Sequence, residues 1–180
     1  MGLKKITLIT LGYFEKEILE HVAALVENEL KGRVNFKREH YDLESHFDPV
    51  RKQYNGNTLL KYVESNLAYD DRITIALVAV DLYIPILTYI FGQAYLNGNS
   101  GIASLYRLGN ERYGLPRDEA LLYSRFAKEI IHELGHCFGL IHCHTYDCVM
   151  KVSTYVEDID QKSTSYCSKC RQQLEQAGHL

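Results

Sequence analysis

The sequence predicts a single α/β domain in which helices pack on a largely parallel β-sheet. Residues 73–80 are almost wholly apolar and rich in β-branched side chains, which is typical of a central strand buried on both faces. Strand-like and helix-like segments alternate along the chain, and this order predicts parallel strands with helices packed on the sheet. A chain of 180 residues is long enough for one domain with its own hydrophobic core.

The chain opens with a predicted strand, helix and strand. Residues 6–11 are predicted to form the first strand. Apolar side chains then recur at helical spacing over residues 14–30, and Gly32 is expected to end this helix. Apolar and polar residues alternate over residues 34–36, as in a half-buried strand.

The middle of the chain contains a long polar stretch and further apolar segments. Residues 41–57 are predicted to form a loop, and residues 58–67 a second helix. After the central strand, residues 88–95 and 102–106 are predicted to be two short strands. The sequence Asn-Gly-Asn-Ser-Gly at residues 97–101 separates them and strongly favours a turn.

A long helix is predicted to start near Pro116 and Asp118 and to run to about Phe138. Its expected core stripe consists of Leu122, Phe126, Ile130, Leu134 and Phe138. Helical periodicity fades from Gly139 until a last short helix over residues 170–176.

Composition argues against two classes of partner. The net charge is -3 and basic residues form no cluster, whereas a dedicated nucleic-acid binder is usually basic on one face. No apolar run approaches the roughly 20 residues that a membrane span needs. The sequence therefore predicts neither a nucleic-acid nor a membrane partner, and no pattern in it predicts an oligomeric state.

The beginning and the cysteines together predict a cytoplasmic location. The apolar stretch at residues 6–11 is short and leads into Glu15-Lys16-Glu17 without a small-residue cleavage site, so it does not read as a signal peptide. All five cysteines lie between residues 137 and 170, beside several histidines. This clustering indicates metal binding in a reducing compartment.

The strongest motif is the sequence HELGHCFGLIH over residues 132–142. Residues four apart lie on the same helix face, so His132 and His136 can reach one metal ion. Gly139 can adopt a left-handed conformation and end the helix, so that His142 approaches from another direction. Three protein ligands leave the fourth tetrahedral position of zinc open, which is the catalytic arrangement. The alternative is that these are unrelated core or surface histidines.

Glu133 is the candidate general base. It follows the first histidine and could hold a zinc-bound water without binding the metal itself. Zinc lowers the pKa of such a water to about 7 and polarises a scissile carbonyl. Glu133 would take the proton from the water and pass it to the leaving amine. The motif therefore predicts peptide-bond hydrolysis. A catalytically silent zinc module that binds peptides or a protein is the alternative.

A second metal site is predicted from two cysteine pairs. Cys143 and Cys148 are followed by Cys167 and Cys170, and two such pairs joined by a loop indicate structural zinc. The alternative interpretation is that the four cysteines form two disulfide bonds. Cys137 is left over and is expected to be a small buried apolar residue inside the helix. His144 could compete as a ligand but is expected to be exposed in a loop.

Residues 132–170 resemble the archaemetzincins, a branch of the metzincin metallopeptidases. The histidine motif is followed, in the order which that family uses, by Cys143, Cys148, Met150, Cys167 and Cys170. The resemblance implies that His132, His136 and His142 bind the catalytic zinc and that Glu133 is the general base. It also implies that the four cysteines hold a second, structural zinc. Met150 would be the methionine of the Met-turn, a tight turn that forms an apolar floor under the metal, although an ordinary core methionine is the alternative.

Two features differ from the family pattern. The gap from Met150 to Cys167 is one residue shorter than expected, which a loop absorbs. Some metzincins place a tyrosine two residues after the Met-turn methionine, where it assists the oxyanion, but this chain has Val152. Tyr155 is a conceivable substitute, and a packing role for it is favoured.

The resemblance implies a zincin-like fold with a twisted mixed sheet. Its antiparallel edge strand would lie above the cleft and pair with an extended peptide substrate. Residues 88–95 are the candidate for this strand, with Gly92 and Ala94 leaving room for a peptide backbone. An ordinary covered edge strand is the alternative. The cleft would separate an N-terminal subdomain, residues 1–139, from a small zinc-stapled subdomain, residues 140–180.

Overall fold

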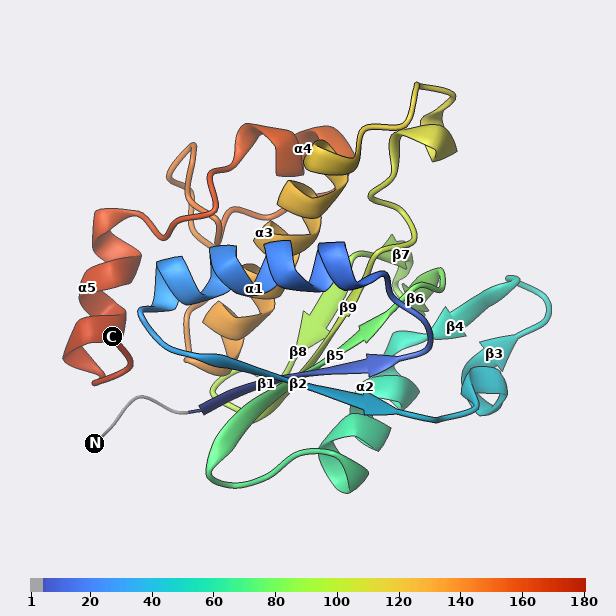
Figure 1. Ribbon diagram of the computed structural model, residues 1–180, viewed down its shortest axis with the longest axis horizontal. Coiled ribbons are helices and arrows are strands. Elements are labelled where there is room, and N and C mark those ends of the chain that lie inside the picture. Colours follow the sequence, from blue (N-terminus) through green and yellow to red (C-terminus); the bar gives the residue numbers. More distant parts are fainter. Residues whose placement is uncertain (1–4) are drawn as a thin grey trace.

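The computed structural model describes residues 5–180 and confirms the α/β architecture (Figure 1). Residues Met1–Lys4 lie outside the described part. The main sheet has five strands in the order β2-β1-β5-β9-β8. Their bounds are β1 Lys5–Leu11, β2 Val34–Glu39, β5 Arg72–Val78, β8 Gly92–Ala94 and β9 Ser100–Ser104.

The strand directions agree with the predicted mixed sheet. β1 pairs in parallel with both β2 and β5, and β5 pairs in parallel with β9. Only β8 is antiparallel, and it forms the edge beside β9. Six of the seven residues of β5 are buried, as expected of a central strand with helices on both faces.

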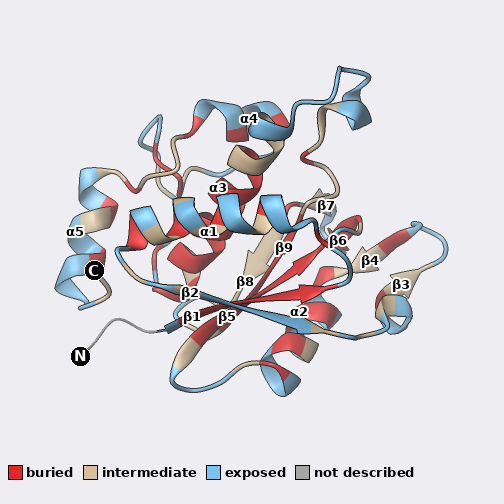
Figure 2. Ribbon diagram, viewed as in Figure 1, coloured by how far each residue is buried: buried red, intermediate tan, exposed pale blue. Residues whose placement is uncertain are grey.

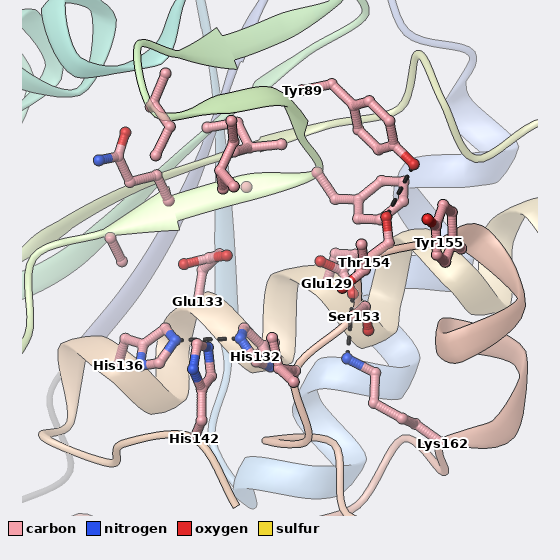
Figure 3. Close-up of a pocket in the computed structure, with 18 of the residues that line it drawn as sticks. Tyr89, Glu129, His132, Glu133, His136, His142, Ser153, Thr154, Tyr155 and Lys162 are labelled. Atoms are coloured by element: carbon pink, nitrogen blue, oxygen red, sulfur yellow. Dashed lines mark hydrogen bonds and ion pairs between the residues drawn. The ribbon is translucent and has the colours of Figure 1, made fainter.

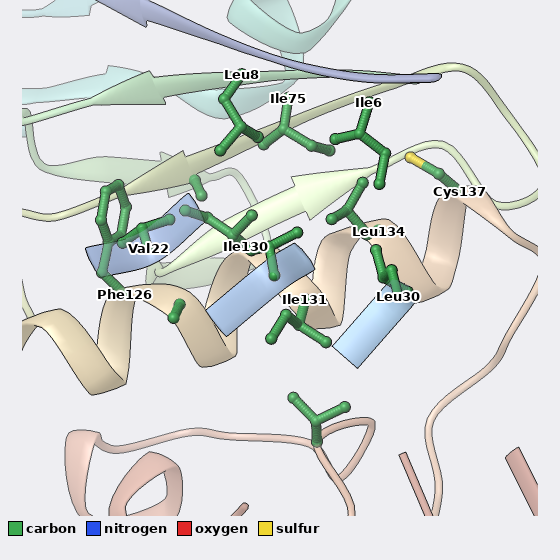
Figure 4. Close-up of a cluster of buried hydrophobic side chains, with 14 of the residues drawn as sticks. Ile6, Leu8, Val22, Leu30, Ile75, Phe126, Ile130, Ile131, Leu134 and Cys137 are labelled. Atoms are coloured by element: carbon green, nitrogen blue, oxygen red, sulfur yellow. The ribbon is translucent and has the colours of Figure 1, made fainter. Parts of the chain in front are cut away.

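The two faces of the main sheet are covered by different helices. On one face lie α1 (Lys16–Leu30) and α3 (Glu119–Cys137), which contact each other. Their side chains pack on Ile6 and Leu8, as Figure 4 shows. On the other face α2 (Gly56–Asn66) packs on Ile9. Side chains of β1 thus alternate between the two cores. Figure 2 shows the strands β1, β5 and β9 as mostly buried, while β2 at one edge is largely exposed.

A second, four-stranded sheet was not predicted. Its strands are β3 Phe47–Asp48, β4 Gln53–Asn55, β6 Leu82–Ile84 and β7 Leu87–Ile90, in the order β3-β4-β6-β7. The prediction of a loop over residues 41–57 is therefore wrong, because this stretch holds two short strands and a 3-10 turn (Leu43–His46). The prediction of one strand over residues 88–95 is also wrong, since the chain leaves the second sheet and joins the main sheet at Phe91.

Local capping explains the helix ends, two of which differ from the prediction. Asn55 accepts hydrogen bonds from the backbone N–H groups of Asn57 and Thr58 and starts α2 two residues earlier than expected. Asp118 caps α3 as predicted by accepting from the N–H of Leu121. At the end of α1, Lys31 adopts the left-handed conformation with φ of 54°, not Gly32.

Two short helices follow the long helix α3. The helix α5 (Ser168–Gln176) starts two residues before the predicted one, and α4 (Val156–Gln161) was not predicted. Both contribute to the same apolar core as α1 and α3, through Val156, Ile159 and Leu174. Within residues 5–180, none of the helices combines the length and the apolar character that crossing a membrane requires.

Candidate metal centre and cleft

His132 and His136 lie on one face of α3 with their Nε2 atoms 3.1 Å apart (Figure 3). The Nδ1 of His132 donates to the carbonyl of Val149 at 2.8 Å, and the Nδ1 of His136 donates to the carbonyl of Leu140 at 2.8 Å. A carbonyl can only accept, so these bonds place the ring protons on Nδ1 and leave lone pairs on Nε2. Two such lone pairs cannot hydrogen-bond to each other.

The spacing of these two nitrogen atoms suits a shared zinc ion. Zinc–nitrogen bonds of 2.0–2.1 Å in a tetrahedron separate two nitrogens by about 3.3 Å. Burial lowers the pKa of His132 well below its usual range, and the positive charge of Lys162 lowers it further. Burial also lowers the pKa of His136. Both rings are therefore neutral near pH 7, as metal ligands must be.

His142 completes the histidine cluster from outside the helix. Gly139 has a φ of +91° and turns the chain after α3, as predicted. The ring of His142 is exposed and lies 5.3 Å from His132 and 5.0 Å from His136 between ring centroids. The ligand atoms of all three residues lie within 4.8 Å of one another, so the structure brings the predicted ligands together.

Glu133 points from α3 toward the edge strand β8 (Figure 3). Its side chain is buried, and its Oε2 has no hydrogen-bond partner among the described residues. Burial raises the pKa of Glu133 well above its usual range, Glu129 raises it further, and Lys162 opposes the shift. A Cβ atom at Gly92 would lie 2.6 Å from Oε1 of Glu133. The glycine at this strand position therefore makes room for the carboxylate.

Met150 packs directly beneath the histidine helix. It is fully buried, and a Cβ atom on Gly135 would lie 2.3 Å from its Sδ. Gly135 lies between His132 and His136 in the sequence, so Met150 packs against the part of α3 that carries them, and its role as the Met-turn residue stays a prediction. The same hypothetical Cβ would lie 3.1 Å from the ring of Tyr166.

Gly135→Ala is expected to destabilise the protein. The added methyl group must displace Met150 and Tyr166 in a closed core, and overpacking of this kind costs about 1–3 kcal/mol. For a chain of this size each kcal/mol lowers Tm by about 2–4 °C. Thermal unfolding would measure the shift. Gly32→Ala is the control, because the nearest atom to its new Cβ is 3.8 Å away. Equal Tm values for the two variants would contradict the close packing.

The four predicted cysteines form a second cluster. The sulfur atoms of Cys143 and Cys167 are 3.8 Å apart, as are those of Cys148 and Cys170, and all four lie within 4.8 Å of one another. A disulfide bond is only about 2.05 Å long, so the four thiols are free. Zinc–sulfur bonds of about 2.3 Å in a tetrahedron separate two sulfurs by about 3.8 Å, so this donor set fits zinc.

Cys137 and His144 stand apart from both clusters, as predicted. Cys137 is buried inside α3, and its Sγ contacts the carbonyl of Ser100 at 3.6 Å. His144 is exposed in the loop before Cys148.

A cleft of about 480 Å³ runs along the histidine cluster between α3 and the strands β7 and β8. The histidines and Glu133 line one end. The segment 152–155 lines the other, so Val152 and Tyr155 both face the cleft. There Tyr155 lies near Tyr89 and away from His136 (Figure 3).

Comparison with known proteins identifies the family. Residues 8–176 match the model of peptidase family M54. The chain belongs to this family, the archaemetzincins. An archaemetzincin of Thermococcus kodakarensis is 34% identical over 178 residues, which cover 96% of each chain. One of Pyrococcus horikoshii is 38% identical over 153 residues, covering 83% of this chain and 78% of the relative.

Solved structures of archaemetzincins share the fold. The crystal structure from Methanopyrus kandleri matches with a TM-score of 0.84 and 31% identity, covering 97% of this chain and 95% of that one. A zinc-dependent peptidase from Methanocorpusculum labreanum matches with a TM-score of 0.81 and 29% identity, covering 94% and 99%. The zincin-like fold is thus confirmed, and this archaemetzincin is a zinc metallopeptidase.

Several polar residues of the archaemetzincin cleft were not predicted from the sequence. Glu129, Ser153 and Lys162 line its far end. Glu129 and Lys162 are 33 positions apart in the sequence and form an ion pair with a 3.4 Å separation. Helical periodicity could have placed Glu129 one turn before Glu133, but no local pattern indicates its partner.

Proposed function

We propose that this archaemetzincin hydrolyses peptide bonds with a zinc ion held by His132, His136 and His142. The observation that supports this most directly is the convergence of unprotonated Nε2 atoms whose ring orientation is fixed by backbone carbonyls. Three histidine ligands leave one tetrahedral position for a reactant. A zinc ion bound there supplies Lewis acidity, which makes hydroxide available near neutral pH and polarises a carbonyl group.

In this proposal Glu133 is the general base. Its Oε2 is buried, lacks a partner among the described residues and faces the cleft, so it is free to accept a proton from an attacking water. The protonated carboxyl group would then donate to the leaving amine.

The proposed substrate is an extended peptide lying along β8. This strand is the antiparallel edge of the main sheet, and all three of its residues line the cleft. Main-chain hydrogen bonds to an edge strand are a common way of binding extended peptides. Glu133 occupies the space beside Gly92. The substrate backbone would therefore lie along the free edge of β8 and not in that space.

We propose that the four cysteines hold a second, structural zinc ion. Four thiolates close the tetrahedron and leave no position for a reactant. This ion would staple residues 140–180, which contain little regular structure apart from α4 and α5. Residues 140–180 include His142 and Met150. The stapled C-terminal subdomain would therefore position the third histidine ligand against the two histidines of the N-terminal subdomain.

Metal analysis tests both sites together. Protein purified without chelator is expected to carry two zinc ions per chain, and mild chelation should remove the ion at the open histidine site first. His136→Ala should retain one ion and lose cleavage of a peptide library that the wild type digests. Elemental analysis measures the zinc ions per chain, and thiol titration measures how many cysteines are free. No more than one ion after remetallation, with the cysteines paired as disulfides, would contradict the two-site proposal.

A further inference from the structure

The end of the cleft away from His136 has a charged floor (Figure 3). The side chains of Glu129 and Lys162 both line it, although they are only 5% and 0% exposed. The Nζ of Lys162 lies 3.4 Å from Oε1 of Glu129 and donates to the carbonyl of Lys151 at 3.0 Å. These two contacts leave one ammonium N–H for another acceptor.

A third polar group faces the same space. The Oγ of Ser153 is buried and has no hydrogen-bond partner within residues 5–180. A buried hydroxyl without a partner costs free energy, and so does a buried ion pair in imperfect geometry. Glu129, Lys162 and Ser153 line one cavity, where a ligand with a hydrogen-bonding group could supply the partners that they lack.

The walls above this floor are aromatic and apolar. The rings of Tyr89 and Phe91 meet edge to face with centroids 5.5 Å apart, and Leu87, Val152 and Tyr155 line the rest. The hydroxyl of Tyr89 donates to the carbonyl of Thr154 at 2.8 Å. This bond links β7 to the segment 152–155 on the other side of the cleft. These residues and the charged floor together enclose the end of the cleft away from His136.

We propose that this end of the cleft is a specificity pocket for a tyrosine side chain next to the scissile bond. The proposal rests on the function proposed above and names the substrate residue. A tyrosine ring matches aromatic walls in offset or edge-to-face contact. Its hydroxyl both donates and accepts, so it can donate to Glu129 and accept from Lys162.

Other side chains fit this floor less well. Glu129 and Lys162 already neutralise each other, so a lysine or glutamate head group would lose its hydration without finding an unpaired opposite charge. Phenylalanine has the same ring but leaves the floor groups unsatisfied. A site built to bind a hydroxyl discriminates strongly against the analogue that lacks it.

Matched peptides test the pocket. The ligands are hydroxamate-capped peptides that differ only in a tyrosine, phenylalanine, lysine or glutamate beside the cap, and calorimetry measures their binding to zinc-loaded protein. The tyrosine peptide is expected to bind at least about tenfold more tightly than the phenylalanine peptide. Peptides with lysine or glutamate should bind more weakly than the tyrosine peptide.

Lys162→Met/Glu129→Leu removes both charges together, because a single change would leave an unpaired buried charge. This variant should lose the preference for tyrosine over phenylalanine.

Lys169→Met/Glu175→Leu removes the same two charges from the exposed surface of α5 and should keep the preference. Equal affinity for the tyrosine and phenylalanine peptides, preference for a charged residue, or no binding of the tyrosine peptide overturns the pocket. A separate peptide-library digest addresses the proposed function, because protein that binds tyrosine selectively but cleaves no peptide would overturn hydrolysis alone.

Discussion

Glu133→Gln is expected to lower the rate of peptide hydrolysis by at least about a hundredfold, the scale of a general-base contribution. Glutamine has the shape of the carboxylate and can occupy the same space beside Gly92, but it cannot accept the proton. The carboxylate is not among the clustered metal-ligand atoms, so zinc content should equal that of the wild type. Initial rates on peptides that the wild type cleaves, together with elemental analysis, measure both quantities.

A matched control separates this effect from a general change of charge. Glu157→Gln neutralises an exposed carboxylate at the start of α4, outside the cleft lining, and should leave the rate unaltered. Were the Glu133 variant as active as the wild type, with its zinc in place, the carboxylate would not be the base. Loss of zinc from that variant would instead show that Glu133 supports the metal.

Cys167→Ser is expected to weaken zinc binding at the histidines by about tenfold or more, although residue 167 is distant from them in the sequence. Cys143 directly follows His142, and its N–H donates to the carbonyl of Met150 at 2.9 Å. The carbonyl of Val149 accepts the Nδ1 proton of His132. Loss of the second ion should loosen this whole segment, since metal-binding energy is also folding energy there. Tm should fall as well.

Competition with a chromogenic chelator would measure the affinity of the histidine site. Cys137→Ala serves as the control, because it removes a thiol from α3 that is not part of the four-sulfur cluster. An unchanged affinity in Cys167→Ser, in protein shown to have lost its second zinc, would mean that the two sites are adjacent without being coupled.

The parts that the sequence predicts well are those encoded by short spacings. The pair His132 and His136 needs only the helical repeat, and the turn to His142 needs only a residue that tolerates positive φ. The central strand is similarly evident, because burial on both faces requires an unbroken apolar run. In each case a single segment contains the pattern that specifies its structure.

The parts that were missed depend on contacts between distant segments. Strands β3, β4 and β6 are only two or three residues long, and β3 and β4 are partly polar, so pairing with neighbours defines them more than composition does. Gly32 was expected to end α1 in the left-handed conformation, but the chain turns one residue earlier, at Lys31. The pair of Glu129 and Lys162 exists only because the loop after α4 returns to α3.

Zinc held by the four thiols, as proposed, would make the stability of the fold a function of free zinc. With an ion held there as proposed, binding to the folded state adds stability that grows with the logarithm of the metal concentration. Each tenfold change in free zinc above the dissociation constant shifts the unfolding free energy by about 1.4 kcal/mol. Under this proposal the protein would have a different unfolding free energy at each zinc activity, and chelators in its surroundings would lower the folded fraction.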